Sequence, residues 1–299
     1  MSSDQKVVTE VEGRRLVISN LDKILYPEAG FTKSDVISYY LKIAPVLLPH
    51  LSGRPVTFFR CPDGVEGTSF FEKNLPKGAP SWVTGIEVPL RSGSGGETMI
   101  YPAVRDVATL VWAANLAVLE LHVPLWRSTT PGEFGLFDQM VFDLDPGPPA
   151  SAVECARVAL LLVDALKDRG HTKVAVKTSG SKGLQLYVAL DPSRPGDDVR
   201  TEARSVARKM ERSSGDLVVS NMRRDLRAGK VLIDWSQNTP VKTTVAVYSL
   251  RARPWPTVST PVTMSEVEGC AESGDPDDLR FLPADVLARV DQDGDLFAL

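Results

Sequence analysis

The chain has 299 residues, of which 43% are hydrophobic and 24% charged, a globular composition that suits one large domain or two closely packed ones. The formal net charge is −4, no apolar window is long enough to span a membrane, and the first residues lack the apolar core of a signal peptide. These features argue against disordered, secreted and membrane-spanning proteins, so we expect a cytoplasmic one. The three separated cysteines form no CxxC pair, which predicts structural thiols rather than a zinc or disulfide framework.

Charge is unevenly distributed along the chain. Residues 264–299 contain ten acidic and two basic side chains, whereas residues 200–230 contain nine basic and four acidic ones. A local basic excess attracts phosphate even in a protein of negative net charge. A solvated helix face has the same composition, so charge alone leaves both interpretations open.

The N-terminal part predicts two helices and two strands. After Thr32 and Asp35, apolar residues recur at helical spacing until Gly53, which predicts an amphipathic helix. Residues 106–119 predict a second, mostly buried helix. The predicted strands cover residues 55–60 and 98–101.

The C-terminal part alternates between strands and helices. Strands are expected at 139–143, 173–178, 184–190, 217–220, 231–234 and 245–249, and helices at 151–170 and 197–212. This mixture predicts an α/β (α+β) fold in which mixed sheets are flanked by helices. We expect a single domain over residues 1–299, with an N-terminal lobe at about 1–130 and a C-terminal lobe at 131–299.

Three aspartates at strand ends are candidate metal ligands. Asp143 and Asp145 fall on one face if their strand continues through both, because successive side chains alternate between faces. Asp234 ends another apolar strand. Three converging carboxylates suit Mg²⁺ or Mn²⁺ and two-ion phosphoryl transfer, although a turn or helix cap uses the same residues.

The loop TSGSKG, at residues 178–183, offers backbone N–H groups and Lys182 to an anion such as a triphosphate. It lacks the Walker A spacing, and a plain hairpin turn is the alternative. Arg227 and Arg251 flank the third aspartate and could supply counter-charge or be surface residues without a role.

The N-terminal segment and an aromatic pair also suggest ligand contacts. Asn20, Lys23 and Lys33 surround a turn that opens the first helix, where they would suit a terminal phosphate or form an ordinary surface turn. Phe70 and Phe71 could stack on bases, although core packing is expected for one of them. His122 is expected to make a buried structural hydrogen bond.

Eight motifs occur in a fixed order: SNLDKILYP, GRPVTFFRCPDG, FFEK, LELHVPLW, VFDLDPG, TSGSKGLQLY, LRAGKVLIDWSQN and KTTVAVYSLR. Together they resemble the primase-polymerase domain family of bacterial end-joining DNA ligases and its stand-alone relatives, within the archaeo-eukaryotic primase superfamily. The resemblance covers about residues 14–299. It implies a two-lobed primase-like core and a template-dependent nucleotidyltransferase that prefers ribonucleotides and acts at gaps or broken DNA ends.

The resemblance also implies ligands and roles for individual residues. It implies two Mn²⁺ or Mg²⁺ ions, an NTP or dNTP substrate, and gapped or broken double-stranded DNA with a 5′-phosphate. Asp143, Asp145 and Asp234 match the catalytic metal ligands; Ser179, Lys182, Gln185, Arg227, Gln237, Arg251, Phe70 and Phe71 match nucleotide contacts; Asn20, Lys23 and Lys33 match the 5′-phosphate pocket. Gln185 departs from the family, which usually has His there, and Phe59 replaces a basic residue of some relatives. We expect an altered nucleotide preference rather than loss of catalysis.

Several functions are compatible with these residues. The chain contains no ligase or nuclease motif, which favours a stand-alone, mycobacterial-type monomer at the nucleoid that fills short gaps, as in base excision repair. It would act with a separate ATP-dependent DNA ligase, and Ku is a second expected partner. The alternatives are a weakly catalytic end-binding module that recruits a ligase, the end-joining polymerase domain of a multidomain ligase, and a two-metal nuclease.

Overall fold

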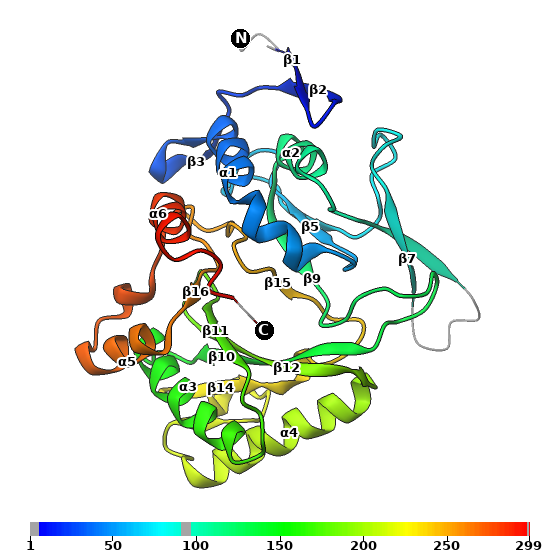
Figure 1. The fold of residues 1–299 in the computed structure, drawn as a ribbon. Helices are drawn as coiled ribbons and strands as arrows, with labels where there is room; N and C mark the ends of the chain where they lie inside the picture. Colours follow the sequence, from blue (N-terminus) through cyan, green and yellow to red (C-terminus); the bar gives the residue numbers. More distant parts are fainter. Residues whose placement is uncertain (1–5, 91–96, 298) are drawn as a thin grey trace.

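The computed structural model describes residues 6–90, 97–297 and 299, which combine helices with β-sheets (Figure 1). In Figure 1 a six-stranded sheet with two long helices forms the lower half, and a four-stranded sheet with α1 and α2 forms the upper half. The predicted α/β class is confirmed. The division into lobes near residue 130 stays a prediction.

The six-stranded sheet has the order β13-β14-β10-β12-β11-β16. Its strands are β13 (Val218–Val219), β14 (Val231–Asp234), β10 (Phe137–Pro146), β12 (Leu184–Arg194), β11 (Val174–Thr178) and β16 (Pro261–Val262). All neighbouring pairs are antiparallel except β13 and β14. Helices α3 (Ala152–Lys167) and α4 (Gly196–Ser213) pack on this sheet. On β10, Phe142 and Leu144 are fully buried and alternate with the more accessible Asp143 and Asp145.

The four-stranded sheet has the order β15-β9-β5-β6. Its strands are β15 (Thr244–Val245), β9 (Val118–Val123), β5 (Thr57–Arg60) and β6 (Phe70–Glu72). Helices α1 (Lys33–Leu51) and α2 (Val107–Asn115) pack beside it, and the Tyr40 hydroxyl on α1 donates to the Leu119 carbonyl on β9. Strand β15 lies between β14 and β16 of the six-stranded sheet along the chain, so its pairing with β9 brings residues near 244 next to the upper half.

Three ribbons and several short elements complete the described chain. The ribbons pair β1 (Lys6–Val11) with β2 (Arg14–Ser19), β3 (Ile24–Tyr26) with β4 (Phe31–Thr32), and β7 (Gly85–Pro89) with β8 (Thr98–Pro102). The remaining helices are η1 (Pro27–Ala29), η2 (Arg224–Leu226), η3 (Trp235–Gln237), α5 (Met264–Ser273), η4 (Pro276–Leu279) and α6 (Pro283–Asp293). Within the described residues, no helix has the length and apolarity needed to cross a membrane.

Two predicted elements differ from the structure. The helix expected over 106–119 ends at Asn115, since Ala117 has a φ of 58° and the chain continues as β9. The apolar run was too uniform to separate a buried helix from a buried strand. The strand expected over 245–249 covers only Thr244–Val245, because the chain turns before Tyr248, whose φ is 64°. Cys61, Cys155 and Cys270 are free and buried, as predicted.

Candidate active site

A row of four polar residues crosses the six-stranded sheet. Asp234 on β14 pairs with Asp143 on β10, Asp143 pairs with Gln185 on β12, and Gln185 pairs with Lys177 on β11. Register partners on neighbouring strands point to the same face of a sheet. Asp145, two residues beyond Asp143, shares that face because β10 runs through both residues, as predicted. We call Asp234, Asp143, Gln185 and Lys177 the cross-strand row.

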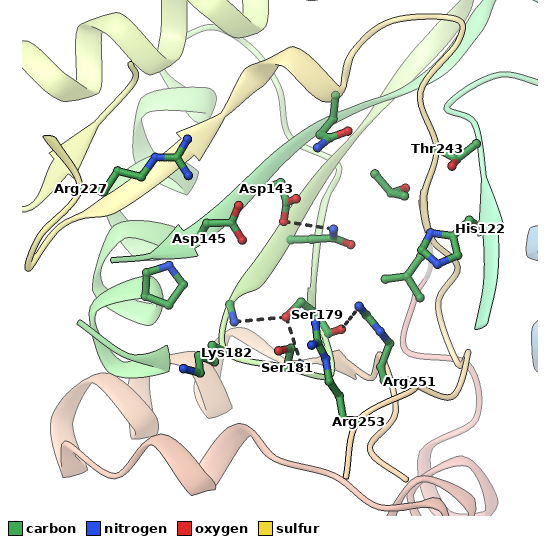
Figure 2. A pocket seen from close by; sticks show the side chains of 16 residues that line it. His122, Asp143, Asp145, Ser179, Ser181, Lys182, Arg227, Thr243, Arg251 and Arg253 are labelled. Carbon is green, nitrogen blue, oxygen red and sulfur yellow. Dashed lines mark hydrogen bonds between the residues drawn. The ribbon is translucent and has the colours of Figure 1, made fainter. Parts of the chain in front are cut away.

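A cavity of about 390 Å³ is lined by two members of this row, Asp143 and Gln185, whereas Asp234 and Lys177 lie outside its lining (Figure 2). Its lining includes eight predicted site residues: Asp143, Asp145, Ser179, Lys182, Gln185, Arg227, Gln237 and Arg251. Figure 2 shows Asp143 and Asp145 on one side, with Ser179 and Lys182 facing them and His122 farther along the wall. The cavity therefore lies between the six-stranded sheet and the segment where β15 pairs with β9. Its volume falls within the range of small-molecule sites.

The two carboxylates of the cavity repel each other. Burial raises the pKa of Asp143, and the nearby Asp145 and Asp234 raise it further, against the opposing effects of the Gln185 amide and Lys177. Burial and Asp234 also raise the pKa of Asp145, although Arg227 opposes this. Crowded carboxylates of this kind are stabilised by a bound cation.

The donor chemistry fits a hard divalent cation, because carboxylate oxygens are the ligands that Mg²⁺ and Mn²⁺ prefer. Among the described residues, no three His, Cys, Asp or Glu side chains are already gathered as a metal-ligand cluster. Asp234 accepts hydrogen bonds from the Ser236 N–H and hydroxyl and, at 3.1 Å, from the Gln237 amide. Asp143 and Asp145 could hold an ion directly, and Asp234 would join them by releasing one of these donors.

The loop between β11 and β12 is held by its own serine. The Ser179 hydroxyl accepts from the backbone N–H groups of Ser181 and Gly183, at 3.2 Å each. The expected backbone cradle is therefore partly occupied, and the exposed Lys182 is the more direct anion donor. Gly183 must lack a side chain, since a Cβ would lie 2.1 Å from the Leu144 carbonyl oxygen.

Arg251 joins this loop to the four-stranded sheet. Its guanidinium donates to the Ser179 carbonyl, and its Nε lies 3.1 Å from a carboxylate oxygen of Glu120. Burial opposes ionisation of Glu120, but the His122 hydrogen bond and the nearby charge of Arg251 outweigh it and lower its pKa to about 2. Arg251 is thus fixed in place at the cavity wall.

His122 illustrates what sequence reasoning missed. It makes the predicted structural hydrogen bond, 2.8 Å from Glu120, yet it also lines the cavity. Thr243 and Arg253 line the cavity too, from irregular segments. The alternation of side chains on the VLELHV strand is a signal that could have placed His122 on one face. No periodic signal marks the other two.

The predicted 5′-phosphate residues gather elsewhere, at the turn that leads into α1. The Lys33 N–H donates to the Lys23 carbonyl, which brings these residues together. Lys23 pairs with Asp63 at 2.8 Å, whereas Lys33 is 6% exposed and donates to the Ser19 and Asn115 carbonyls. Asn20 adopts a φ of 54°. We call Asn20, Lys23 and Lys33 the N-terminal turn; none of them lines the cavity described above.

The aromatic pair lies at the edge of the four-stranded sheet. Phe70 is 40% and Phe71 58% exposed, so the expectation that one packs in the core is wrong. Edge strand β6 has no neighbour on its outer side in the described sheet, which leaves both rings accessible. The Phe71 ring contacts Phe59, with ring centroids 4.7 Å apart, and His122, at 5.3 Å. Phe71 is therefore connected to the cavity through His122.

Comparison with known proteins identifies one family over nearly the whole chain. The model of the family described as "LigD, primase-polymerase domain" matches residues 32–297. The multifunctional non-homologous end joining DNA repair protein LigD of Mycobacterium tuberculosis is 44% identical over 289 residues, which cover 95% of this chain and 36% of that protein. The bifunctional LigD of Bacillus subtilis is 32% identical over 85% of this chain and 40% of its own length. This chain thus spans between a third and a half of either relative.

One solved structure is similar to this chain over nearly the full length of both chains. The polymerase domain of Mycobacterium tuberculosis Ligase D, in complex with DNA, has a TM-score of 0.86 and 43% sequence identity, and the match covers 94% of this chain and 96% of that one. The family implies metal-dependent nucleotidyl transfer. The cross-strand row and its cavity thus lie in a nucleotidyltransferase fold, and the chain belongs to the LigD primase-polymerase domain family.

Proposed function

We propose that this domain extends a primer 3′-hydroxyl on gapped or broken double-stranded DNA, with the template strand selecting the incoming nucleotide. The observation that carries the proposal is the crowding of Asp143 and Asp145 in a cavity that also contains Lys182, Arg227 and Arg251. Carboxylates with raised pKa values beside cationic side chains suit a metal-bound triphosphate.

The residues present divide this task between them. Asp143, Asp145 and Asp234 would hold two Mn²⁺ or Mg²⁺ ions, which supply charge stabilisation for an in-line displacement at the α-phosphate. Lys182, Ser179 and Arg227 would bind the triphosphate, and Gln185 and Gln237, which also line the cavity, would donate to it. Arg251, fixed by Glu120, orients the loop that carries Ser179. Phe70 and Phe71 are exposed for stacking on bases near the cavity.

The N-terminal turn is the proposed site for the downstream 5′-phosphate, with Lys23 as its most accessible cation. Lys33 would contribute by fixing the turn through two carbonyls. Lys23 is paired with Asp63, so phosphate binding requires an exchange of partners.

The relatives named for non-homologous end joining support a role at broken DNA ends. Gap filling during excision repair uses the same chemistry and is the second proposal. A ribonucleotide preference, a monomeric state, and cooperation with an ATP-dependent DNA ligase or with Ku belong to this proposal as well.

Extension of a labelled primer on gapped DNA tests the function. The reactions compare DNA with and without a downstream 5′-phosphate, rNTPs with dNTPs, and Mn²⁺ with Mg²⁺. We expect template-directed extension, stimulated by the 5′-phosphate and strongest with rNTPs and Mn²⁺. End binding without incorporation would indicate a binding module, and DNA degradation without added nucleotide would indicate a nuclease.

A further inference from the structure

Lys177 is a buried lysine that the functions above leave unexplained. It lies on β11, is 1% exposed, and ends the cross-strand row beside Gln185. A buried amine is costly unless its hydrogen bonds are made. Strand β11 could have carried an apolar residue here, so the contacts of Lys177 indicate what it does.

The Lys177 amine determines what the Gln185 carbonyl can bind. Its Nζ donates to Gln185 Oε1 at 2.5 Å and to the Ser259 hydroxyl at 2.7 Å. The Tyr187 hydroxyl lies 3.3 Å from Oε1, but it has a single proton, for which Thr244 Oγ1 at 2.9 Å is the nearer acceptor. Lys177 is therefore the main donor to the amide oxygen.

The other end of the same amide therefore faces Asp143. Gln185 Nε2 donates to Asp143 Oδ1 at 3.1 Å. A reversed amide would place N–H groups against the Lys177 amine and an oxygen against the Asp143 carboxylate. A buried polar group left unpaired is costly, which favours the observed orientation. A neutral amine could accept from a reversed amide through its lone pair, but the amide oxygen would then still face the Asp143 carboxylate.

The orientation has a consequence for ligand binding. Gln185 lines the cavity, and its Nε2 carries two N–H bonds. Within the described residues, Asp143 is the acceptor for Nε2. The second N–H can donate to a phosphate oxygen. A reversed amide would instead present its own oxygen, which would repel the phosphate.

We infer that Lys177 is a positioning residue for nucleotide recognition, which holds the Gln185 amide with its N–H groups toward Asp143 and the triphosphate site. The inference rests on the proposed function, since it assumes that the cavity receives a nucleoside triphosphate. It adds a residue that does not line this cavity and that orients a cavity residue, Gln185, from behind.

A double-mutant cycle on the full chain tests this inference. Binding of an α,β-imido analogue of ATP with Mn²⁺ is measured by calorimetry for wild type, Lys177→Met, Gln185→Ala and the double variant. We expect Lys177→Met to weaken binding about ten-fold when Gln185 is present and less than about two-fold when it is absent. An equal penalty in both backgrounds would show a merely structural role and overturn the inference.

Two further variants keep the test decisive. Lys230→Met is the matched control, because Lys230 is half-buried, donates to the Gly215 carbonyl and does not line the cavity; its binding should stay at the wild-type level. If the melting temperature shows that Lys177→Met does not fold, Lys177→Gln takes its place. We expect Lys177→Gln to weaken binding of the ATP analogue about three-fold when Gln185 is present and to have no such effect when Gln185 is replaced by Ala. Primer extension by the wild type is measured separately, so failure of the proposed function is distinguished from failure of this inference.

Discussion

The cavity and the N-terminal turn both contain charged side chains expected to bind ligands, but they differ in how far those charges are already balanced. In the cavity, burial and mutual repulsion raise the pKa values of Asp143 and Asp145. In the N-terminal turn, Lys23 is paired with Asp63, and Lys33 donates to two backbone carbonyls. The first region gains from a cation, whereas the second must exchange a partner before it can bind an anion.

A charged motif alone therefore does not show whether its charges are free to bind a ligand. Both regions are recognisable in the sequence, yet only the partners supplied by the fold distinguish unbalanced charge from balanced charge. We therefore expect substitution of the cavity carboxylates Asp143 and Asp145 to reduce activity strongly without loss of stability. Substitutions in the N-terminal turn should affect stability or give small effects on phosphate binding.

The largest expected effect is that of Asp143→Ala. Primer extension should fall by about 10³-fold or more, because a principal metal ligand is lost. The melting temperature of the metal-free protein should be unchanged or higher, since a buried and repelled carboxylate is removed. Extension assays and thermal melts check both results, and a strongly destabilised variant would contradict the contrast between the two regions.

The loop that closes the cavity gives the next largest effect. Gly183→Ala would force a Cβ toward the Leu144 carbonyl, so we expect a loss of about 3 kcal/mol in the free energy of unfolding and a parallel loss of extension. Gly269→Ala is the matched control, because Gly269 is exposed on helix α5 with no heavy atom near its added Cβ. It should stabilise the protein by about 0.5–1 kcal/mol. Denaturant unfolding measures both changes.

Glu120 gives a pH-dependent test on the cavity wall. Its pKa is lowered to about 2 in the folded protein from an ordinary value of 4.5. A lowered acid pKa contributes stability above the unfolded value, and this contribution is lost as the pH falls from about 4.5 toward 2. Wild type should exceed Glu120→Gln by up to about 3 kcal/mol at pH 7, and the difference should shrink at pH 3. A difference that does not change with pH would show that Glu120 acts by packing alone.

The smallest expected effects are those at Lys23. Lys23→Ala should reduce the stimulation of extension by a 5′-phosphate about five-fold, because one charge-assisted contact is lost. Asp63→Asn should increase that stimulation by about two-fold, since Lys23 would no longer have to leave an ionised partner. Extension on gapped DNA with and without the phosphate measures both. A decrease for Asp63→Asn would argue against partner exchange.

Residues on regular strands were the most predictable part of the site. The two-residue spacing of Asp143 and Asp145 gave their common face because β10 runs through both. Lys177 was missed, although its place in the VAVKT strand is an anomaly, because its importance depends on the register that pairs it with Gln185. Thr243 and Arg253 come from irregular segments that no periodicity describes.

The fold was predictable to a similar degree. The strands and helices predicted for the C-terminal part mostly occur where expected, whereas α5 and α6 were not predicted. The ribbon of β1 and β2 and the edge strand β6 were missed, and the helix over 106–119 was drawn too long. In each case tertiary pairing decides the structure, through a partner strand that a local pattern does not show.

We propose that Asp143 and Asp145, whose pKa values are raised, form the metal site together with Asp234. This proposal is tested by measuring the binding of Mn²⁺ to wild type, Asp143→Ala and Lys23→Ala. Binding is monitored through the loss of the electron paramagnetic resonance signal of the free ion. We expect wild type and Lys23→Ala to bind Mn²⁺ equally, and Asp143→Ala to bind at least about ten-fold more weakly. Equal binding of Mn²⁺ by all three proteins would contradict the assignment of Asp143 as a metal ligand.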